Sequence, residues 1–197
     1  MALFPFFVNI ENKEGLIIGT GKHAQEKIQR LEPYGPKLRI IPESEFSEKD
    51  LEALPAFVVA AGEDIEENRR IANLCKKKRI LVNVVDEQEY CDFVFPSLIS
   101  HGNLSVGICT NGASPAAGVL LKQKFQEQIP DNMEEILDFL KSVRPVITKT
   151  LTDKAQRFKF YYELSENCMR ENRPLTEEEF RRQLLWHAQS ARKNLQE

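Results

Sequence analysis

The amino-acid sequence predicts an α/β fold: a Rossmann-type parallel sheet, then a small hairpin-plus-helix dimerisation region, then a helical C-terminal region. Three observations predict it. A glycine-rich turn follows an early apolar segment, short apolar segments alternate with helical sequence as far as residue 86, and the chain beyond residue 131 has helical spacing almost throughout. We expect these three regions to span residues 1–110, 111–145 and 146–197.

Composition indicates a globular protein of ordinary charge. The 197 residues are 42% hydrophobic and 29% charged, with a formal net charge of −3. No basic excess favours nucleic-acid binding, and no apolar run approaches the ~20 residues of a membrane helix. Residues 1–7 lack the basic lead-in and long apolar core of a signal peptide, and the four cysteines are scattered, without disulfide or metal-site spacing. We therefore expect a cytoplasmic protein with free thiols that binds neither nucleic acid nor membranes.

The first strand, Leu16–Ile18, leads into Gly19-Thr20-Gly21-Lys22-His23-Ala24, which has the G-x-G-x-x-A spacing of a dinucleotide-binding turn. Gly19 permits the tight turn, Gly21 lets the backbone approach a pyrophosphate, and Ala24 lets the new helix pack close to the strand. That helix, from Lys22 to about Leu31, offers its first N–H groups to the phosphates, and for His23 the backbone N–H is the expected contact. The turn predicts a bound dinucleotide.

A second strand is expected over residues 38–41. Glu43 follows it, about two dozen residues beyond Gly19, close to where this fold places an acid for the adenosine ribose. A solvated loop carboxylate explains Glu43 equally well. The charged residues 45–54 predict a short helix with Leu51 and Leu54 as its anchors.

The third strand, residues 57–61, ends at Gly62, which places Ala61 and Gly62 where a strand's carboxyl end faces the cofactor. A helix over residues 65–78 follows, with Ile65, Ala72 and Cys75 expected to point inward.

A fourth strand, residues 80–85, ends in Asp86, on the side where open α/β sheets bind ligands. A carboxylate there accepts a proton or contacts a metal, although a turn or capping aspartate is the plainer alternative.

Residues 93–99 and 104–109 then predict an antiparallel hairpin on the edge of the sheet. Ser114 and Pro115 next begin a helix as N-cap and first residue. Its N–H groups, with Asn111 and Gly112 before it, suit an anion, but a plain capped helix start is the slightly simpler interpretation.

The chain beyond residue 131 is predicted to be helical. Asp131 and Glu134 have the spacing of a capping box, and Arg144-Pro145 breaks or kinks that helix. A second helix carries Phe158, Tyr161, Tyr162 and Leu164. Thr176–Glu179 forms another capping box, with Leu175 and Phe180 as a hydrophobic staple, before a last helix with Leu184, Leu185 and Ala188. Such one-sided helices need a partner surface, either the sheet domain or a second subunit, and of these we favour a homodimer.

Three motifs together resemble the siroheme synthase family. Phe4–Val8 with Ile18–Ala24 resembles the family's start, Asn83–Asp86 leading to Phe95–Ile99 resembles its most distinctive segment, and Asn111–Pro115 resembles a third. The order and spacing agree, and the helical tail fits the family's dimerisation and C-terminal helices. The resemblance therefore covers essentially the whole chain.

The resemblance implies a dehydrogenase that oxidises precorrin-2 to sirohydrochlorin in siroheme biosynthesis and passes a hydride to NAD. It implies that Gly19–Ala24 bind the NAD pyrophosphate, with Lys22 and His23 closest, and that Glu43 and Ser44 hold the adenosine ribose. Asp86 matches the aspartate assigned to proton transfer, and to metal handling in members that also insert iron. Asn111, Gly112 and Ser114 fall at the tetrapyrrole pocket.

Two points stay open at the level of sequence. Residues 42–56 are shorter than the same stretch in many members, which weakens the assignment of Glu43 and Ser44. The chain either is a dehydrogenase alone or also inserts Fe²⁺ or Co²⁺ as a sirohydrochlorin ferrochelatase. A nucleotide-sensing module that binds NAD without turnover is the alternative from another class.

Overall fold

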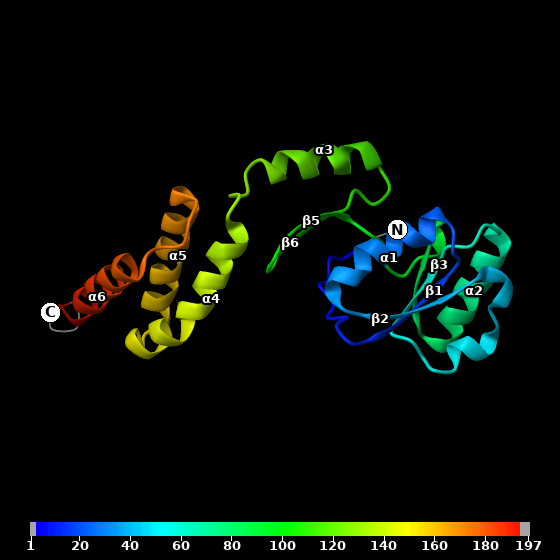
Figure 1. Cartoon of the computed structure of the whole chain (residues 1–197), viewed down its shortest axis with the longest axis horizontal. Coiled ribbons are helices and arrows are strands. Elements are labelled where there is room, and N and C mark those ends of the chain that lie inside the picture. Colours follow the sequence, from blue (N-terminus) through cyan, green and yellow to red (C-terminus); the bar gives the residue numbers. More distant parts are fainter. Residues whose placement is uncertain (1–2, 194–197) are drawn as a thin grey trace. The chain divides into compact units, whose positions relative to one another are not determined.

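The computed structural model describes residues 3–193, in which the chain forms two compact units (Figure 1). The first unit contains the residues up to Phe95 together with Asn111–Ala113, and the second contains Pro96–Thr110 and the chain from Ser114 onward. The hairpin after residue 95 therefore clusters with the C-terminal helices, whereas the sequence suggested a first boundary at residue 110.

The first unit is built on a parallel sheet of four strands in the order β2-β1-β3-β4. Ile17 pairs with Ile40 of β2 and with Val59 of β3, and Val59 pairs with Asn83 of β4. The predicted strands are confirmed to within two residues at each end. Their bounds are β1 (Glu14–Ile18), β2 (Lys37–Ile41), β3 (Phe57–Ala60) and β4 (Leu81–Val84).

Helices α1 (Lys22–Leu31) and α2 (Ile65–Lys78) cover opposite faces of this sheet (Figure 1). Successive strand residues point to opposite faces, so each strand contributes to two clusters of buried side chains. One cluster joins strand residues to α2 through Ile71, Ala72 and Cys75, and the other joins the alternate strand residues to α1 through Ala24, Ile28 and Leu31. This two-sided burial explains why the strands are apolar at nearly every position. Ile65, expected inside, is 53% exposed because it begins α2 beside the cap residue Asp64.

The connection from β2 to β3 contains no α-helix, so the short helix predicted for residues 45–54 is present only as 3₁₀ structure. Two short 3₁₀ turns occupy it, η2 (Glu43–Glu45) and η3 (Glu48–Leu51), after an earlier one, η1 (Glu32–Tyr34), that follows α1. Ser47 and Asp50 form a capping box at the start of η3, in which the Asp50 carboxylate accepts the N–H of the N-cap residue Ser47 at 2.8 Å. The same carboxylate accepts a bond from Arg39 at 2.8 Å. Leu51 is buried as expected, but Leu54 is 62% exposed with a positive φ.

The hairpin does not extend the main sheet, so its predicted place on the sheet's edge is wrong. The segment after the 3₁₀ turn η4 (Gln88–Tyr90) closes the free edge of β4 instead. The Cys91 thiol accepts the Val84 N–H and donates to the Val84 carbonyl, both at 3.2 Å. Asp92 bonds to Val82 in two ways as well. Its N–H donates to the Val82 carbonyl at 2.7 Å, and its carboxylate accepts the Val82 N–H at 3.2 Å. No ladder position on that side of β4 remains for another strand at these two residues.

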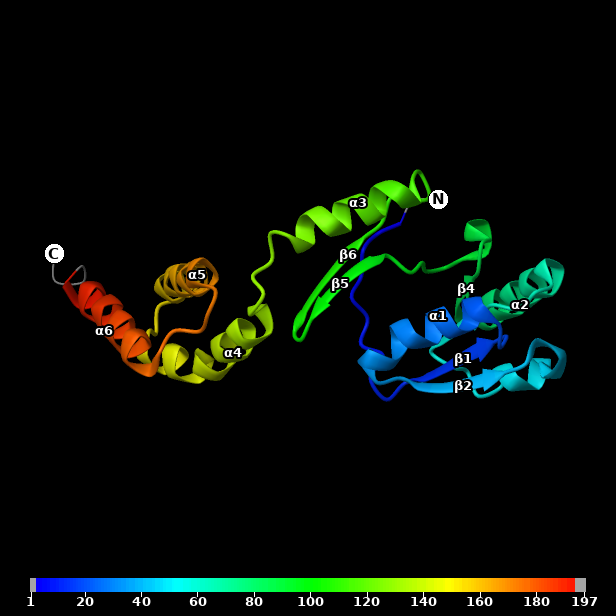
Figure 2. The same ribbon diagram turned by 45° about the horizontal axis from the view of Figure 1, so that its top comes forward.

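In the second unit, β5 (Ser97–His101) and β6 (Leu104–Ile108) form an antiparallel sheet of their own. Helix α3 (Pro115–Gln126) runs beside this hairpin (Figure 2). Gly118 permits the approach, since a Cβ there would lie 3.2 Å from the Ser97 hydroxyl. Ser114 caps α3 by accepting the Ala117 N–H at 3.1 Å, and Pro115 is the first helical residue, as predicted.

Helices α4 (Met133–Thr150), α5 (Lys154–Glu171) and α6 (Glu177–Lys193) share one buried cluster. One expectation for α4 is wrong, and of the break or kink predicted at Pro145 the break does not occur. Its N-cap is Asn132 rather than Asp131, and the Asn132 side chain donates to the Asn172 carbonyl at 2.9 Å instead of capping its own helix. Pro145 lies inside α4 without ending it.

The inward faces of the last two helices differ partly from the prediction. Phe160 and Leu164 are buried in α5, whereas Phe158 and Tyr162 are mostly exposed, as is Leu185 in α6. The capping box is confirmed: Glu179 accepts the Thr176 N–H at 2.8 Å, Thr176 accepts the Glu179 N–H at 3.3 Å, and both staple residues join the cluster. Among the described residues, no helix has the length and apolar character required to cross a membrane.

Candidate functional site

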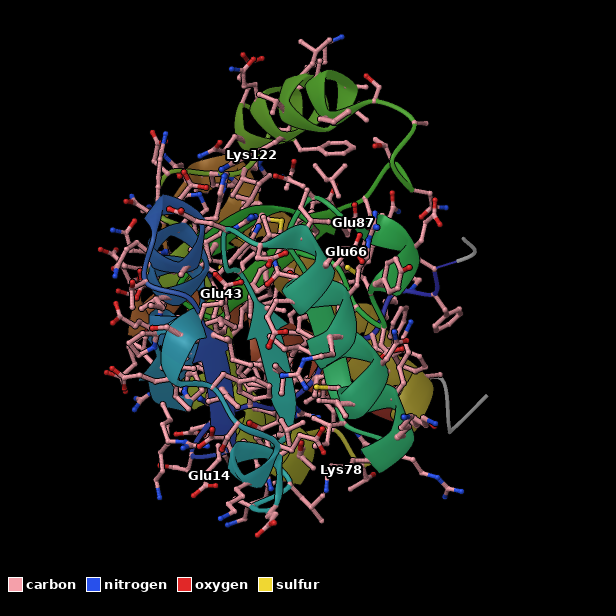
Figure 3. The ribbon with its side chains drawn as sticks, turned by 90° about the vertical axis from the view of Figure 1, so that its right-hand side faces the viewer. Glu14, Glu43, Glu66, Lys78, Glu87 and Lys122 are labelled. Carbon is pink, nitrogen blue, oxygen red and sulfur yellow. The ribbon has the colours of Figure 1, made fainter. Side chains whose placement is uncertain are left out.

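The candidate site lies at the end of the sheet where the carboxyl ends of its four strands meet. The ladder continues one residue past the strands, with the N–H groups of Gly19, Ala61 and Val85 bonded at 2.8, 2.8 and 3.0 Å to the ends of neighbouring strands. The loops that carry the predicted cofactor residues and Asp86 leave the sheet at this end, whereas Asn111, Gly112 and Ser114 follow β6. Figure 3 shows Glu43, Glu66 and Glu87 toward this end of the sheet, whereas Glu14 and Lys78 lie at the opposite end.

The glycine turn after β1 has the properties that the sequence predicted. Gly19 has φ +119, and a Cβ there would lie 2.3 Å from the Ala61 carbonyl oxygen, so only glycine fits. Gly21 has φ −71 and nothing within 4 Å of an added Cβ, so its outer side is open to a ligand. The turn thus brings Gly19 against Ala61 and leaves Gly21 facing open space.

Helix α1 begins at this turn without a side-chain cap and without an acidic residue in its first turn. Thr20, Lys22 and His23 are exposed there, whereas Ala24 is buried against the sheet. In contrast, Asp64 caps α2 and Asp153 caps α5. The first N–H groups of α1 therefore have no side-chain acceptor from their cap residue, and together with the helix dipole they favour an anion.

Glu43 comes two residues after β2 and lies beneath the turn that follows β3. Its carboxylate accepts the N–H groups of Glu63 at 3.0 Å and Asp64 at 3.2 Å. A Cβ on Gly62 would lie 2.0 Å from the Glu43 carboxylate, so Gly62 makes room for it. Glu43 thus has a structural partner, yet each carboxylate oxygen keeps acceptor capacity for a ribose hydroxyl. Ser44 is exposed beside it in η2.

Asn68 is a residue of this site that sequence reasoning missed. Its side chain is 3% exposed, accepts the Gly62 N–H at 3.1 Å and donates to the Gly62 carbonyl at 3.0 Å. This pair of bonds fixes the peptide groups at the end of β3. The available signal was a polar residue on the inward stripe of α2, three residues before Ile71, because a buried amide needs partners.

Asp86 is an exposed residue with φ +60, in the left-handed region that non-glycine residues seldom adopt. Its neighbours hold it there. The Val85 N–H bonds to Ala60, and Glu87 forms a bidentate pair with Arg69 of α2 at 2.9 and 3.0 Å. The hydrogen bond from Arg69 keeps the pKa of Glu87 below its usual value. A backbone in this conformation is a feature that clusters at functional sites.

The predicted substrate residues divide between the two units. Asn111 and Gly112 belong to the first, both with positive φ. A Cβ on Gly112 would lie 2.3 Å from the Gln88 side-chain oxygen, so this turn packs against the loop that carries Asp86. Ser114 belongs to the second unit, where it caps α3 and where the Thr110 hydroxyl donates to its carbonyl at 3.1 Å.

Metal ligands do not gather at this end of the sheet. Within residues 3–193, no group of three or more histidine, cysteine, aspartate or glutamate side chains is placed to hold a metal ion. The four cysteines form no disulfide. Burial raises the pKa of the Cys75 thiol to about 12, which keeps that thiol protonated.

Known proteins resemble this chain along most of its length. A family described as "Putative NAD(P)-binding" matches residues 6–97. Siroheme synthases from Neisseria meningitidis serogroup C, Actinobacillus pleuropneumoniae serotype 3 and Thioalkalivibrio sulfidiphilus are 26%, 28% and 27% identical over 82%, 83% and 87% of the chain. The chain spans only 37%, 37% and 39% of these relatives.

A solved structure of SirC, precorrin-2 dehydrogenase, has the same fold, with a TM-score of 0.71 and 21% sequence identity over 95% of this chain and 100% of that one. The α/β fold class and the similarity to siroheme synthases that the sequence indicates are both confirmed.

Proposed function

We propose that this protein is an NAD-dependent precorrin-2 dehydrogenase that makes sirohydrochlorin. The proposal rests on two features at the carboxyl end of one sheet. Helix α1 begins after the glycine turn without a side-chain cap, and Asp86 is held at positive φ. The first suits a dinucleotide phosphate, and the second suits proton transfer. The similarity to siroheme synthases over more than four-fifths of the chain supports the substrate.

In the proposed reaction, precorrin-2 loses a hydride and a proton. NAD, when bound, supplies the hydride acceptor. The residues of this chain position the two reactants: the N–H groups of the first turn of α1 hold the pyrophosphate, Glu43 and Ser44 hold the adenosine ribose, and Asp86 accepts the proton. Asn111, Gly112 and Ser114 line the tetrapyrrole side. Positioning of this kind lowers the barrier by holding the donor carbon and the acceptor in contact.

We propose NAD rather than NADP because Glu43 follows β2. A carboxylate at this position accepts ribose hydroxyls and repels the 2′-phosphate of NADP. The adenosine site is compact, since Glu43 already bonds to the turn after β3.

We also propose a homodimer in which residues 111–145 form the contact region, with residues 1–110 for NAD and 146–197 as the helical remainder. Val119, Leu120 and Phe125 of α3 are each about half exposed, and apolar side chains of this size are commonly covered by a partner. Sedimentation equilibrium measures the mass directly, and a monomer at micromolar concentration would contradict the proposal. A cytoplasmic location stays a prediction.

The proposed activity is tested anaerobically with purified protein, precorrin-2 and either NAD or NADP, by following NADH absorbance and the sirohydrochlorin spectrum. Turnover with NAD supports the proposal. Folded protein that binds NAD but yields no NADH above background, with no effect of any tetrapyrrole on NAD binding, points to the NAD-sensing module instead. Adding Fe²⁺ or Co²⁺ to sirohydrochlorin tests the ferrochelatase activity, in which the metal would be a substrate and Asp86 would handle it.

A further inference from the structure

Lys27 is a half-buried lysine of α1 that the proposed mechanism does not use. It follows the first turn of the helix, one turn beyond His23, and its Nζ lies 4.8 Å from the centre of the Phe95 ring. The guanidinium of Arg30 lies 5.6 Å from the centre of the same ring. Phe95 in turn packs beside Phe93, with ring centres 5.8 Å apart. Two cations thus share one aromatic ring.

The Lys27 ammonium is partly removed from water. Burial lowers the pKa of Lys27, and Arg30 acts in the same direction, while Glu26, Asp86 and Cys91 oppose them without cancelling the effect. Among residues 3–193, no carboxylate lies within 4.0 Å of the Lys27 Nζ. A cation that is partly removed from water without an ion-pair partner gains free energy when an anion reaches it.

The position of Lys27 favours the substrate side of the site. The sheet order places β2, with Glu43 after it, at one edge and β4, with Asp86 after it, at the other. Three strand spacings, roughly 14 Å, separate those two strands. The Asn83 side chain of β4 donates to the Phe93 carbonyl at 3.0 Å, and Phe93 packs beside Phe95, so the ring that Lys27 faces lies on the β4 side, away from the adenosine end.

We propose that Lys27, supported by Arg30 and the Phe95 ring, binds a peripheral carboxylate of the tetrapyrrole and so positions the macrocycle beside Asp86. This inference rests on the proposed dehydrogenase function and extends it to a residue outside the glycine turn and the two substrate motifs. Precorrin-2 carries carboxylates around its whole rim, so one can reach an ammonium at the β4 side while the reacting carbon faces the nicotinamide. Phe95 keeps the ammonium in place by a cation–π contact before the substrate arrives.

The test uses the full chain with three variants. Lys27→Gln removes the charge and keeps a polar side chain of similar length, Lys27→Arg keeps the charge, and Lys77→Gln removes an exposed lysine near the end of α2 as a matched control. For each variant, the KM for precorrin-2, the kcat, the Kd for NAD and the melting temperature are measured. The melting temperature detects a merely structural role.

Lys27→Gln is expected to raise the KM for precorrin-2 roughly tenfold, as for the loss of one charge-assisted hydrogen bond, with the Kd for NAD unchanged. Lys27→Arg recovers most of the wild-type KM, and Lys77→Gln matches the wild type. An unchanged KM in Lys27→Gln overturns the proposal. A raised Kd for NAD with an unchanged KM also overturns it, because the anion would then belong to the cofactor.

Failure of the proposed function gives a different result, namely no NADH from the wild-type protein. In that case equilibrium dialysis with sirohydrochlorin still decides the role of Lys27. Weaker binding by Lys27→Gln than by the wild type and by Lys77→Gln supports a carboxylate contact. Equal binding by all three proteins, or none by the wild type, rejects it.

Discussion

The carboxylate of Glu43 lies against the Cα of Gly62, where any larger residue would meet it, and it accepts the two N–H groups that follow Gly62. One side chain therefore joins the end of β2 to the end of β3. The sequence left two roles for Glu43 open, a ribose ligand or a loop carboxylate, and these contacts are compatible with both.

Glu43→Gln separates the two roles. The amide keeps one acceptor oxygen but sets an NH₂ group against a backbone N–H, so we expect the Kd for NAD to rise about fivefold, close to 1 kcal/mol. The preference for NAD over NADP should fall as well, because the charge that repels the 2′-phosphate is gone. Glu45→Gln, an exposed carboxylate in the same 3₁₀ turn, is the control. Unchanged affinity for both cofactors would leave Glu43 with the loop role alone.

Gly19→Ala and Gly21→Ala should affect different properties. At Gly19 the positive φ and the Ala61 carbonyl oppose a methyl group, so we expect the free energy of unfolding to fall by about 2 kcal/mol or more. At Gly21 the backbone suits alanine and the space is open, so the change should stay below ~1 kcal/mol. NAD binding should nevertheless weaken at Gly21, since the methyl group faces the pyrophosphate. Urea unfolding and NAD titration measure the two effects, and intact NAD binding in Gly21→Ala would count against the proposed cofactor site.

Asp86→Asn should lower kcat roughly 100-fold, the typical contribution of one general base, with little change in stability. Asparagine tolerates the left-handed backbone that Asp86 adopts, so the fold loses only the proton acceptor. Asp86→Ala adds a backbone cost of about 1 kcal/mol. Anaerobic turnover and thermal melting of both variants separate chemistry from strain. A kcat close to wild type in Asp86→Asn would remove Asp86 from the proton transfer.

Glu179 gives the second unit a measurable dependence on pH. The hydrogen bond from Arg173, with those from Thr176, lowers the pKa of Glu179 from its ordinary value of 4.5 to about 2. A carboxyl group whose pKa is lower in the folded state stabilises the fold above its unfolded pKa, and that contribution is lost as the pH falls. Glu179→Gln should therefore lower the melting temperature at pH 7 and lower it less near pH 2. Equal effects at both pH values would show that the ion pair contributes nothing.

Local pattern was sufficient for the sheet and for α1. An apolar strand, a Gly-x-Gly turn and a stripe through Ala24, Ile28 and Leu31 define α1 to the residue and β1 to within two residues. The same reasoning placed Gly19 and Asp86 at one sheet edge, since the carboxyl ends of parallel strands share an edge.

Long-range contacts decided what pattern could not. Glu43 bonds to a turn about twenty residues away, and Asn68 holds Gly62 from the next helix. In α5, aromatic residues at 158, 160, 161 and 162 allow several inward stripes, and packing against α6 selected Phe160. The hairpin is excluded from the main sheet at β4 because Cys91 and Asp92 bond to that strand. No local sequence pattern predicts these bonds.

The closure of β4 by a thiol and a carboxylate has a consequence for the behaviour of the protein in concentrated solution. An open edge strand recruits strands from other molecules, which is a common route to insoluble assemblies. Here the β4 side of the sheet ends at two side chains instead of a further strand, so the closure of that side depends in part on the chemistry of Cys91. Modification of its sulfur would remove both bonds to Val84 and uncover part of the edge. An unmodified Cys91 thiol is therefore part of what keeps this side of the sheet closed.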